Sequence, residues 1–142
     1  MPMIDIYAPK GTFADPHDLA TRAAATVMRV EGVPEISMFR ENTAAFVHEL
    51  PEAAISDVTG SSGHVRVQVL TNAGALDRDK QLAVVEQLTA LVVEASGDAS
   101  LERRTWVLLT EATPGGWGLW GHAQTNEELV AAARAEIASL RG

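Results

Sequence analysis

The first residues of the chain alternate between apolar and polar side chains, which is the pattern of a β-strand with one buried face. Ile4 and Ile6 flank Asp5, and an Ala-Pro-Lys-Gly segment then breaks the alternation. Apolar residues recur at helical spacing after Asp15-Pro16, a typical helix start, because aspartate caps the first turn and proline already has the φ angle of the first helical position. The elements predicted for this first half are a strand over 3–8, a helix from 16 up to Gly32, and a strand over 44–50.

The same order of elements returns after the turn-rich segment 60–63. Asp77 follows Asp15 by 62 positions, and Glu111 follows Glu49 by the same 62. A constant offset between equivalent elements indicates an internal repeat, so we predict two fused β-α-β units over about residues 2–60 and 64–112. The elements predicted for the second unit are a strand over 64–71, a helix with the apolar stripe Leu82, Val85, Leu88 and Val92 that ends near Gly97, and a strand over 106–111.

The residues after the second unit predict a short hairpin and a closing helix. Residues 113–121 are dense in glycine, as hairpins with tight turns are. Thr125 and Glu128 have the spacing of a capping box, in which each side chain bonds the backbone of the other residue. We therefore predict a C-terminal hairpin and helix over 113–142. The apolar stripe expected on this helix consists of Leu129, Ala133, Ile137 and Leu140.

Together these elements predict a single α/β domain of the α+β type over residues 1–142. A right-handed crossover makes the two strands of each unit parallel and places both long helices on one face of a four-stranded core sheet. The chain has no further layer to cover the other face of the sheet. We therefore expect oligomerisation through that face.

Charge and composition exclude several classes of partner. The chain has 142 residues, of which 46% are hydrophobic and 21% charged, and its formal net charge is −8 at pH 7. We expect no nucleic-acid partner and no anionic membrane surface, because nothing in the sequence clusters basic residues. No apolar run approaches the roughly 20 residues of a membrane span, and the first residues lack the features of a signal peptide, so we expect a cytoplasmic protein.

The chemistry of metals and thiols is also disfavoured. The chain has no cysteine, and its four histidines do not show the HxH or HxxxH spacing of metal ligands. We therefore expect no metal site.

Pro2 is the most informative candidate for catalysis. Removal of Met1 would leave it as a secondary amine at the head of a strand. An α-amino group has a pKa of about 7.7 to 8.0, and partial burial disfavours its charged form, so a free base is available near neutral pH. Such an amine is suited to general base catalysis. The alternative is that Met-Pro is an ordinary chain start without a catalytic role.

The context of Pro2 resembles the tautomerase superfamily, in particular its 4-oxalocrotonate tautomerase branch. Pro2 opens a β-α-β unit, and the second unit ends in Thr110-Glu111 followed by the loop Gly-Trp-Gly-Leu-Trp-Gly over 116–121. The length and the duplication are similar to those of the cis-3-chloroacrylic acid dehalogenases and malonate semialdehyde decarboxylases. The resemblance implies a tautomerase/MIF-like fold, a homotrimer, Pro2 as the catalytic base, no cofactor, and a small enol or keto acid as substrate.

The sequence departs from this superfamily at its arginines. Thr12, Ala44, Ala75 and Trp106 stand where arginines of the family hold carboxylates, so a dianionic substrate is disfavoured. Cations that replace these arginines have to come from other positions in the chain. The expected substrate-binding residues are Arg40 and Arg66 as cations, His48 and His122 as hydrogen-bond donors to an enolate oxygen, and Trp117 as a pocket wall. Each also has a structural interpretation: a solvated arginine, a hydrogen-bonded histidine, or a tryptophan that anchors an interface.

Three functions follow from this sequence. The first is a cofactor-independent tautomerase that uses Pro2 as general base. The second is a hydratase, dehalogenase or decarboxylase of the same superfamily, in which protonated Pro2 acts as an acid. The third is a catalytically silent trimer that binds a small ligand in the same pocket.

Overall fold

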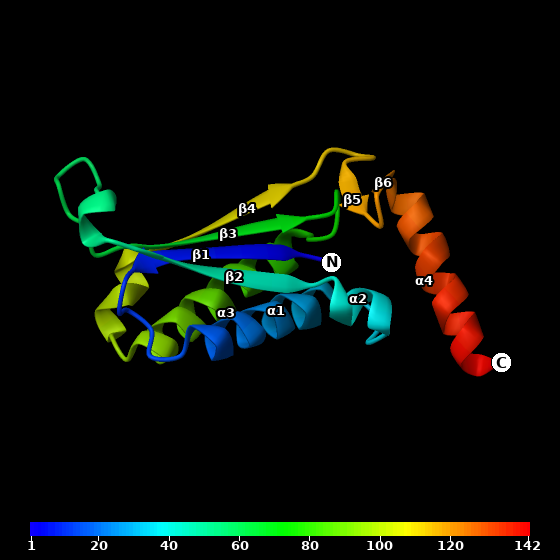
Figure 1. Ribbon diagram of the computed structural model, residues 1–142, viewed down its shortest axis with the longest axis horizontal. Helices are drawn as coiled ribbons and strands as arrows, with labels where there is room; N and C mark the ends of the chain where they lie inside the picture. The colour runs from blue at the N-terminus through cyan, green and yellow to red at the C-terminus, as the bar shows by residue number, and fades with distance from the viewer.

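The computed structural model describes residues 1–142 and contains a four-stranded sheet with the strand order β2-β1-β3-β4 (Figure 1). A two-stranded hairpin and a helix follow the sheet in the sequence. The strands are β1 (Met3–Pro9), β2 (Ala44–Leu50), β3 (Val65–Thr71), β4 (Thr105–Glu111), β5 (Trp117–Leu119) and β6 (His122–Gln124). The helices are α1 (Pro16–Glu31), α2 (Ser37–Glu41), α3 (Arg78–Ser96) and α4 (Asn126–Arg141), and the 3-10 turns are η1 (Glu52–Ala54) and η2 (Ala99–Arg104).

Strand pairing confirms the two predicted β-α-β units. β1 is parallel to β2, and β3 is parallel to β4, while β1 and β3 pair antiparallel at the centre of the sheet. The first residues of β1 and β3 are 62 positions apart, as are the first residues of α1 and α3. The predicted fold class, a four-stranded core sheet with both long helices on one face and a C-terminal hairpin and helix, is therefore confirmed.

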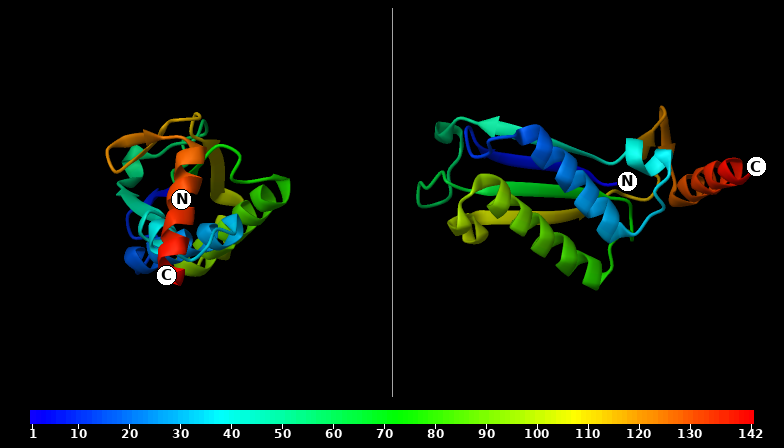
Figure 2. Two further views of the ribbon diagram at one scale, coloured as in Figure 1. Left: turned by 90° about the vertical axis from the view of Figure 1, so that its right-hand side faces the viewer. Right: turned by 90° about the horizontal axis from the view of Figure 1, so that it is seen from below.

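The main core lies between the sheet and the pair α1 and α3, which cover the same face (Figure 2). Alternate residues of β1 and β3 point into it, and the side chains of Ile4, Ile6 and Val67 are at most 1% exposed. Asp15 caps α1 by accepting the Asp18 N–H at 3.0 Å. The period-two pattern of the sequence thus corresponds to a sheet with one face packed against helices.

The apolar stripe predicted for α3 was wrong at two positions. Leu82 is 51% exposed and Val85 is 37% exposed. α3 carries apolar residues on more than one side, and the side that meets the sheet and α1 begins at Val84 and continues four, seven and eight positions later. The buried residues of α3 are Val84, Leu88, Leu91 and Val92. None of the helices combines the length and the hydrophobicity needed to cross a bilayer.

The other face of the sheet is open and mixes polar with aromatic side chains. Phe46 of β2 is 54% exposed, and Trp106 and Leu108 of β4 are 47% and 44% exposed. No element of this chain covers these residues, as the sequence predicted.

α4 lies across the end of the sheet where β1 begins (Figures 1 and 2). Leu129 and Ala133 are its buried residues, whereas Leu140, which the predicted stripe included, is 71% exposed because the last turns run past the body of the protein. The short helix α2, which the sequence analysis missed, supports α4. The N–H of Met38 in α2 donates to Glu136 Oε2 at 3.1 Å.

The predicted capping box begins α4. The Thr125 hydroxyl accepts the Glu128 N–H at 3.1 Å, and Glu128 Oε1 accepts the Thr125 N–H at 3.3 Å. This backbone N–H is the main reason why the pKa of the exposed Glu128 carboxyl lies below its ordinary value, and the Thr125 hydroxyl and His122 act in the same direction. The ionised form of Glu128 therefore stabilises the start of α4.

We expect the local stability of α4 to fall in acid because of Glu128. A lowered pKa means that the stabilisation is complete above the unfolded value of about 4.3 and is lost as the pH falls through the lower native value. Hydrogen exchange of α4 amides, corrected for intrinsic rates, should show this loss in the wild type and not in Glu128→Gln. Glu127→Gln, which removes a neighbouring charge outside the capping box, is the control. Equal behaviour of the two variants would contradict the assignment.

Candidate active site at the N-terminus

The N-terminus of the chain is buried. Met1 is 1% exposed, and Pro2 is also fully buried. The carbonyl of Pro2 accepts the Ala44 N–H at 3.3 Å, which extends the pairing of β1 with β2 by one residue. The side chain of Met1 belongs to a second apolar cluster, which is separate from the main core. The other buried members of this cluster are Ile36, Met38, Trp117, Leu129 and Ala133.

The N-terminal amine has one partner. The Met1 ammonium donates to Glu31 Oε1 at 3.0 Å, and both side chains are nearly inaccessible, at 1% and 7% exposure. Glu31 is the last residue of α1, and the left-handed Gly32, with a φ angle of +78°, ends the helix there. The backbone carbonyl of Glu31 accepts Lys80 Nζ from α3 at 2.8 Å. The second carboxylate oxygen, Oε2, is buried without a hydrogen-bond partner.

A cavity of about 390 Å³, called the terminal chamber below, lies beside Met1 and Glu31. It is open to solvent on one side and is lined by the α1–α2 connection, the β3–α3 connection and α4. Most of its lining is apolar, and Glu31 and Arg134 are its only charged residues. Asn72 also lines it, and its Nδ2 is buried without a partner. The principal apolar lining residues are Met1, Val33, Phe39, Leu129 and Ile137.

A side chain of α4 holds one of the loops around the terminal chamber. Asn126 Nδ2 donates to the carbonyl of Ala73 in the β3–α3 connection at 3.0 Å. With the contact from Glu136 to α2, this bond ties α4 to two separate parts of the chamber wall. The chamber is therefore a product of the C-terminal helix as much as of the repeat.

Of the residues singled out in the sequence, Pro2 and Trp117 lie at this end of the sheet, but neither is among the residues that line the terminal chamber while Met1 is present. Trp117 of β5 is 7% exposed and packs in the same apolar cluster as Met1. Its neighbour Trp120 is 64% exposed and takes a positive φ angle of 55°. In this structure Met1 makes the Pro2 nitrogen a tertiary amide, which is not basic.

His48 and Arg66 lie on the open face of the sheet, away from the terminal chamber. His48 Nε2 is 2.7 Å from Asp5 Oδ1, and its ring stacks on Tyr7 with a centroid separation of 4.3 Å. The Arg66 guanidinium lies 5.7 Å from the centre of the same Tyr7 ring. Within one chain, these side chains therefore have their polar and aromatic contacts with one another.

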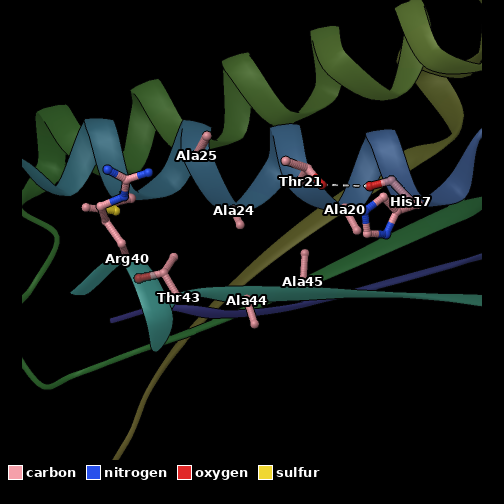
Figure 3. Close-up of a pocket in the computed structure, with 10 residues that line it drawn as sticks. His17, Ala20, Thr21, Ala24, Ala25, Arg40, Thr43, Ala44 and Ala45 are labelled. Carbon is pink, nitrogen blue, oxygen red and sulfur yellow. Dashed lines mark hydrogen bonds between the residues drawn. The ribbon is translucent and has the colours of Figure 1, made fainter. Parts of the chain in front are cut away.

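Arg40 and His122 are also separated from the terminal chamber. Arg40 extends from α2 along a groove of about 420 Å³ between α1 and the edge strand β2, where small side chains such as Ala24 and Ala45 face it (Figure 3). His122 of β6 is exposed, with Nε2 2.6 Å from Glu128 Oε2.

The sequence analysis missed three residues of the chamber: Glu31, Asn72 and Arg134. They come from the end of α1, the end of β3 and the middle of α4, so no local motif joins them. The burial of a glutamate directly before a helix-ending glycine has no signature in one sequence. No group of three or more His, Cys, Asp or Glu side chains is arranged to hold a metal ion.

Comparison with known proteins identifies the fold. No protein-family model and no curated protein matches the sequence. The crystal structure of Pt0534 inactivated by 2-oxo-3-pentynoate matches with a TM-score of 0.71 and 20% identity, over 84% of this chain and 93% of that chain. A symmetric trimer of wild-type fused 4-OT matches with a TM-score of 0.72 and 16% identity, over 89% and 98%. N1, a member of the cis-3-chloroacrylic acid dehalogenase family, matches with a TM-score of 0.70 and 14% identity, over 92% and 90%.

Each of these matches extends over most of this chain and most of the matched chain. At such identities the similarity concerns the fold and not the activity. The chain therefore has the fold of the tautomerase superfamily, in its form with two β-α-β units fused in one chain.

Proposed function

We propose that this protein is a cofactor-independent tautomerase in which Pro2, freed by removal of Met1, transfers a proton between carbon and oxygen of a small carbonyl compound. The observation that carries the proposal is the position of the chain end. It lies at the wall of a mostly apolar chamber, and the side chain of Met1 fills space that its removal would open. A small ligand could then reach the Pro2 nitrogen.

The chemistry of Pro2 follows from its surroundings. A secondary amine takes a proton from the carbon next to a carbonyl in one direction and returns it in the other. Most of the lining is apolar, so the few polar groups in it decide how a carbonyl compound is oriented. The unpartnered Nδ2 of Asn72 is a candidate donor to the substrate oxygen, on which negative charge develops in the enolate.

The charges around the chamber favour a substrate with at most one negative charge. Arg134 is the only cationic side chain in the lining, and the net charge of −8 opposes the approach of anions. A dicarboxylate would have one carboxylate without a cation. A monoanionic or neutral enol with an apolar body fits the lining better.

The neighbours in fold support this class of substrate. Pt0534 is inactivated by 2-oxo-3-pentynoate, an electrophilic 2-oxo acid with a single carboxylate. A nucleophilic amine adds to the triple bond of such a compound, and a Pro2 amine in the chamber would react in this way.

A silent binding protein is the second candidate. It is favoured by one observation: with Met1 retained, the terminal amine is paired with Glu31 and the chamber holds no basic nitrogen at Pro2. Retention of Met1 in the native protein would therefore favour the binding function over catalysis.

We also propose that the protein is a homotrimer, assembled through the open face of its sheet. Fused 4-OT forms a trimer on the same fold. The exposed Phe46, Trp106 and Leu108 form an apolar surface that no other part of this chain covers.

Pro2→Ala should lower kcat/KM for an aromatic monoanionic enol such as phenylenolpyruvate by about 10²-fold or more, the usual size of a general acid–base contribution. The rate of enol decay in protein whose residue 2 amine is free measures this effect. Pro114→Ala, which changes an exposed proline outside the chamber, should leave the rate unchanged. Equal rates for wild type and Pro2→Ala would place the base elsewhere.

Arg134→Gln should raise KM for the monoanionic enol by about tenfold, as expected for the loss of a charge-assisted hydrogen bond, and should leave a neutral enol of similar size unaffected. Arg40→Gln, in the groove between α1 and β2, is the control and should change neither value. If Arg40→Gln alone raised KM, the substrate carboxylate would bind at the α1–β2 groove instead.

Trp106→Asp should disrupt the trimer, because a charge would be buried in the interface. Sedimentation at micromolar concentration should detect a trimer for the wild type and smaller species for this variant. Leu140→Asp, at a residue that is more exposed and lies at the far end of α4, should remain trimeric. A stable wild-type monomer would contradict the proposed assembly.

A further inference from the structure

We infer that Glu31 is a second catalytic residue, which shares one proton with the Pro2 amine and exchanges it with the oxygen of the substrate. This inference rests on the proposed role of Pro2. In a mechanism in which Pro2 acts alone, the Glu31 carboxylate has no role.

The burial of Glu31 is the first observation. Its side chain is 7% exposed, and the carboxylate has one bonded oxygen and one free oxygen. A buried carboxylate with an unused acceptor is costly, and proteins retain such groups where a ligand completes them. Because Glu31 lines the terminal chamber, a ligand there is a direct candidate for the missing donor.

The partner of Glu31 is the second observation. Its Oε1 already binds the terminal ammonium of the chain at 3.0 Å. Removal of Met1 transfers the terminal amine to the next residue, whose Cα lies about 3.8 Å from that of Met1. Glu31 then loses its bonded cation, and the proposal assigns the new terminal amine, that of Pro2, to its place.

Other charged groups around Glu31 are already engaged or lie at the edge of the chamber. Lys80 of α3 binds the backbone carbonyl of Glu31, and no ion pair joins it to the carboxylate. Glu136 of α4 accepts the Met38 N–H. Arg134 of α4 is exposed at the open side of the chamber. An arginine keeps its proton in a protein, so Arg134 does not exchange one with Glu31.

The step is balanced for conversion of an enol to a ketone. The enol O–H gives its proton to the Glu31 carboxylate, and the O–H electron pair becomes the second bond of the carbonyl. The electron pair of the C=C bond takes a proton from the Pro2 ammonium at the adjacent carbon. The proton on Glu31 then passes to the neutral Pro2 amine, which restores the starting pair.

A pair that must hold one proton gives a bell-shaped pH dependence, because the second proton inactivates it in acid and loss of the only proton inactivates it in base. In Glu31→Gln, kcat for the neutral enol should fall by about 10²-fold, and the acid limb of the kcat/KM profile should disappear. Glu31→Asp, which keeps a carboxylate, should retain the bell shape. Glu35→Gln is the matched control, because Glu35 is an exposed glutamate in the α1–α2 connection that follows Glu31.

The rate at which 2-oxo-3-pentynoate labels Pro2 should rise in Glu31→Gln, whereas the rate of turnover should fall. The free amine attacks the triple bond, a nitrogen–carbon bond forms, and the amine proton ends on the adjacent carbon. A carboxylate partner favours the ammonium form, so the pH midpoint of labelling should move to lower pH in Glu31→Gln. The variant should thus label faster at neutral pH while it turns over more slowly, which a misfolded protein would not do.

Two results would overturn the inference. If Pro2 labels with the same pH midpoint in the wild type and in Glu31→Gln, and both keep the bell-shaped profile, Glu31 carries no proton in the reaction and only the role of Pro2 survives. If no label reaches Pro2 in any of these proteins, the proposed function fails and the role of Glu31 fails with it.

Discussion

In the chain that retains Met1, the terminal ammonium forms a buried ion pair with Glu31 at the end of α1. A terminal ammonium that is almost inaccessible to water requires a negative partner, and breaking such a pair by removing one member costs about 3–5 kcal/mol. Glu31 is held by α1, whose residues Leu19, Ala23 and Val27 are fully buried against the sheet. The position of the first residue is thus set by the main core, one helix away.

The terminal chamber is lined by segments outside the repeat as well as by the ends of its elements. The repeat alone supplies the sheet and its two covering helices. α2 and α4 then close the end of the sheet over Met1, and the hairpin contributes Trp117 to the same apolar cluster. α4 is held by its capping box and by contacts to α2 and to Ala73, and it contributes Leu129, Ala133 and Ile137 to the lining of the chamber.

Much of the fold could be predicted because its signals are local. The signals that predicted it lie between residues close in sequence or follow from counting positions. They are the strand alternation around Ile4, the caps at Asp15 and Thr125, and the repeated offset of 62. The stripe of α3 failed because that helix has apolar residues on several sides, and only packing selects Val84 over Leu82. α2 was missed because it is five residues long and has no side-chain cap.

The candidate site was predictable only in part, for a physical reason. Pro2 was singled out from the chemistry of a terminal secondary amine at the head of a strand, and Trp117 from a resemblance to known sequences. Glu31, Asn72 and Arg134 share the terminal chamber through tertiary contacts between distant segments, and no spacing in the sequence encodes such contacts. The cations expected from sequence, Arg40 and Arg66, belong to a groove at the sheet edge and to the open face.

The most direct test of this account is the mass of the N-terminal peptide of the native, untagged protein, before and after treatment with 2-oxo-3-pentynoate. The account predicts that Met1 is absent and that the reagent adds once, to Pro2. A native chain that retains Met1, or one that starts at Pro2 and takes up the reagent at another residue, would contradict the central claim that Pro2 is the reactive amine of the terminal chamber.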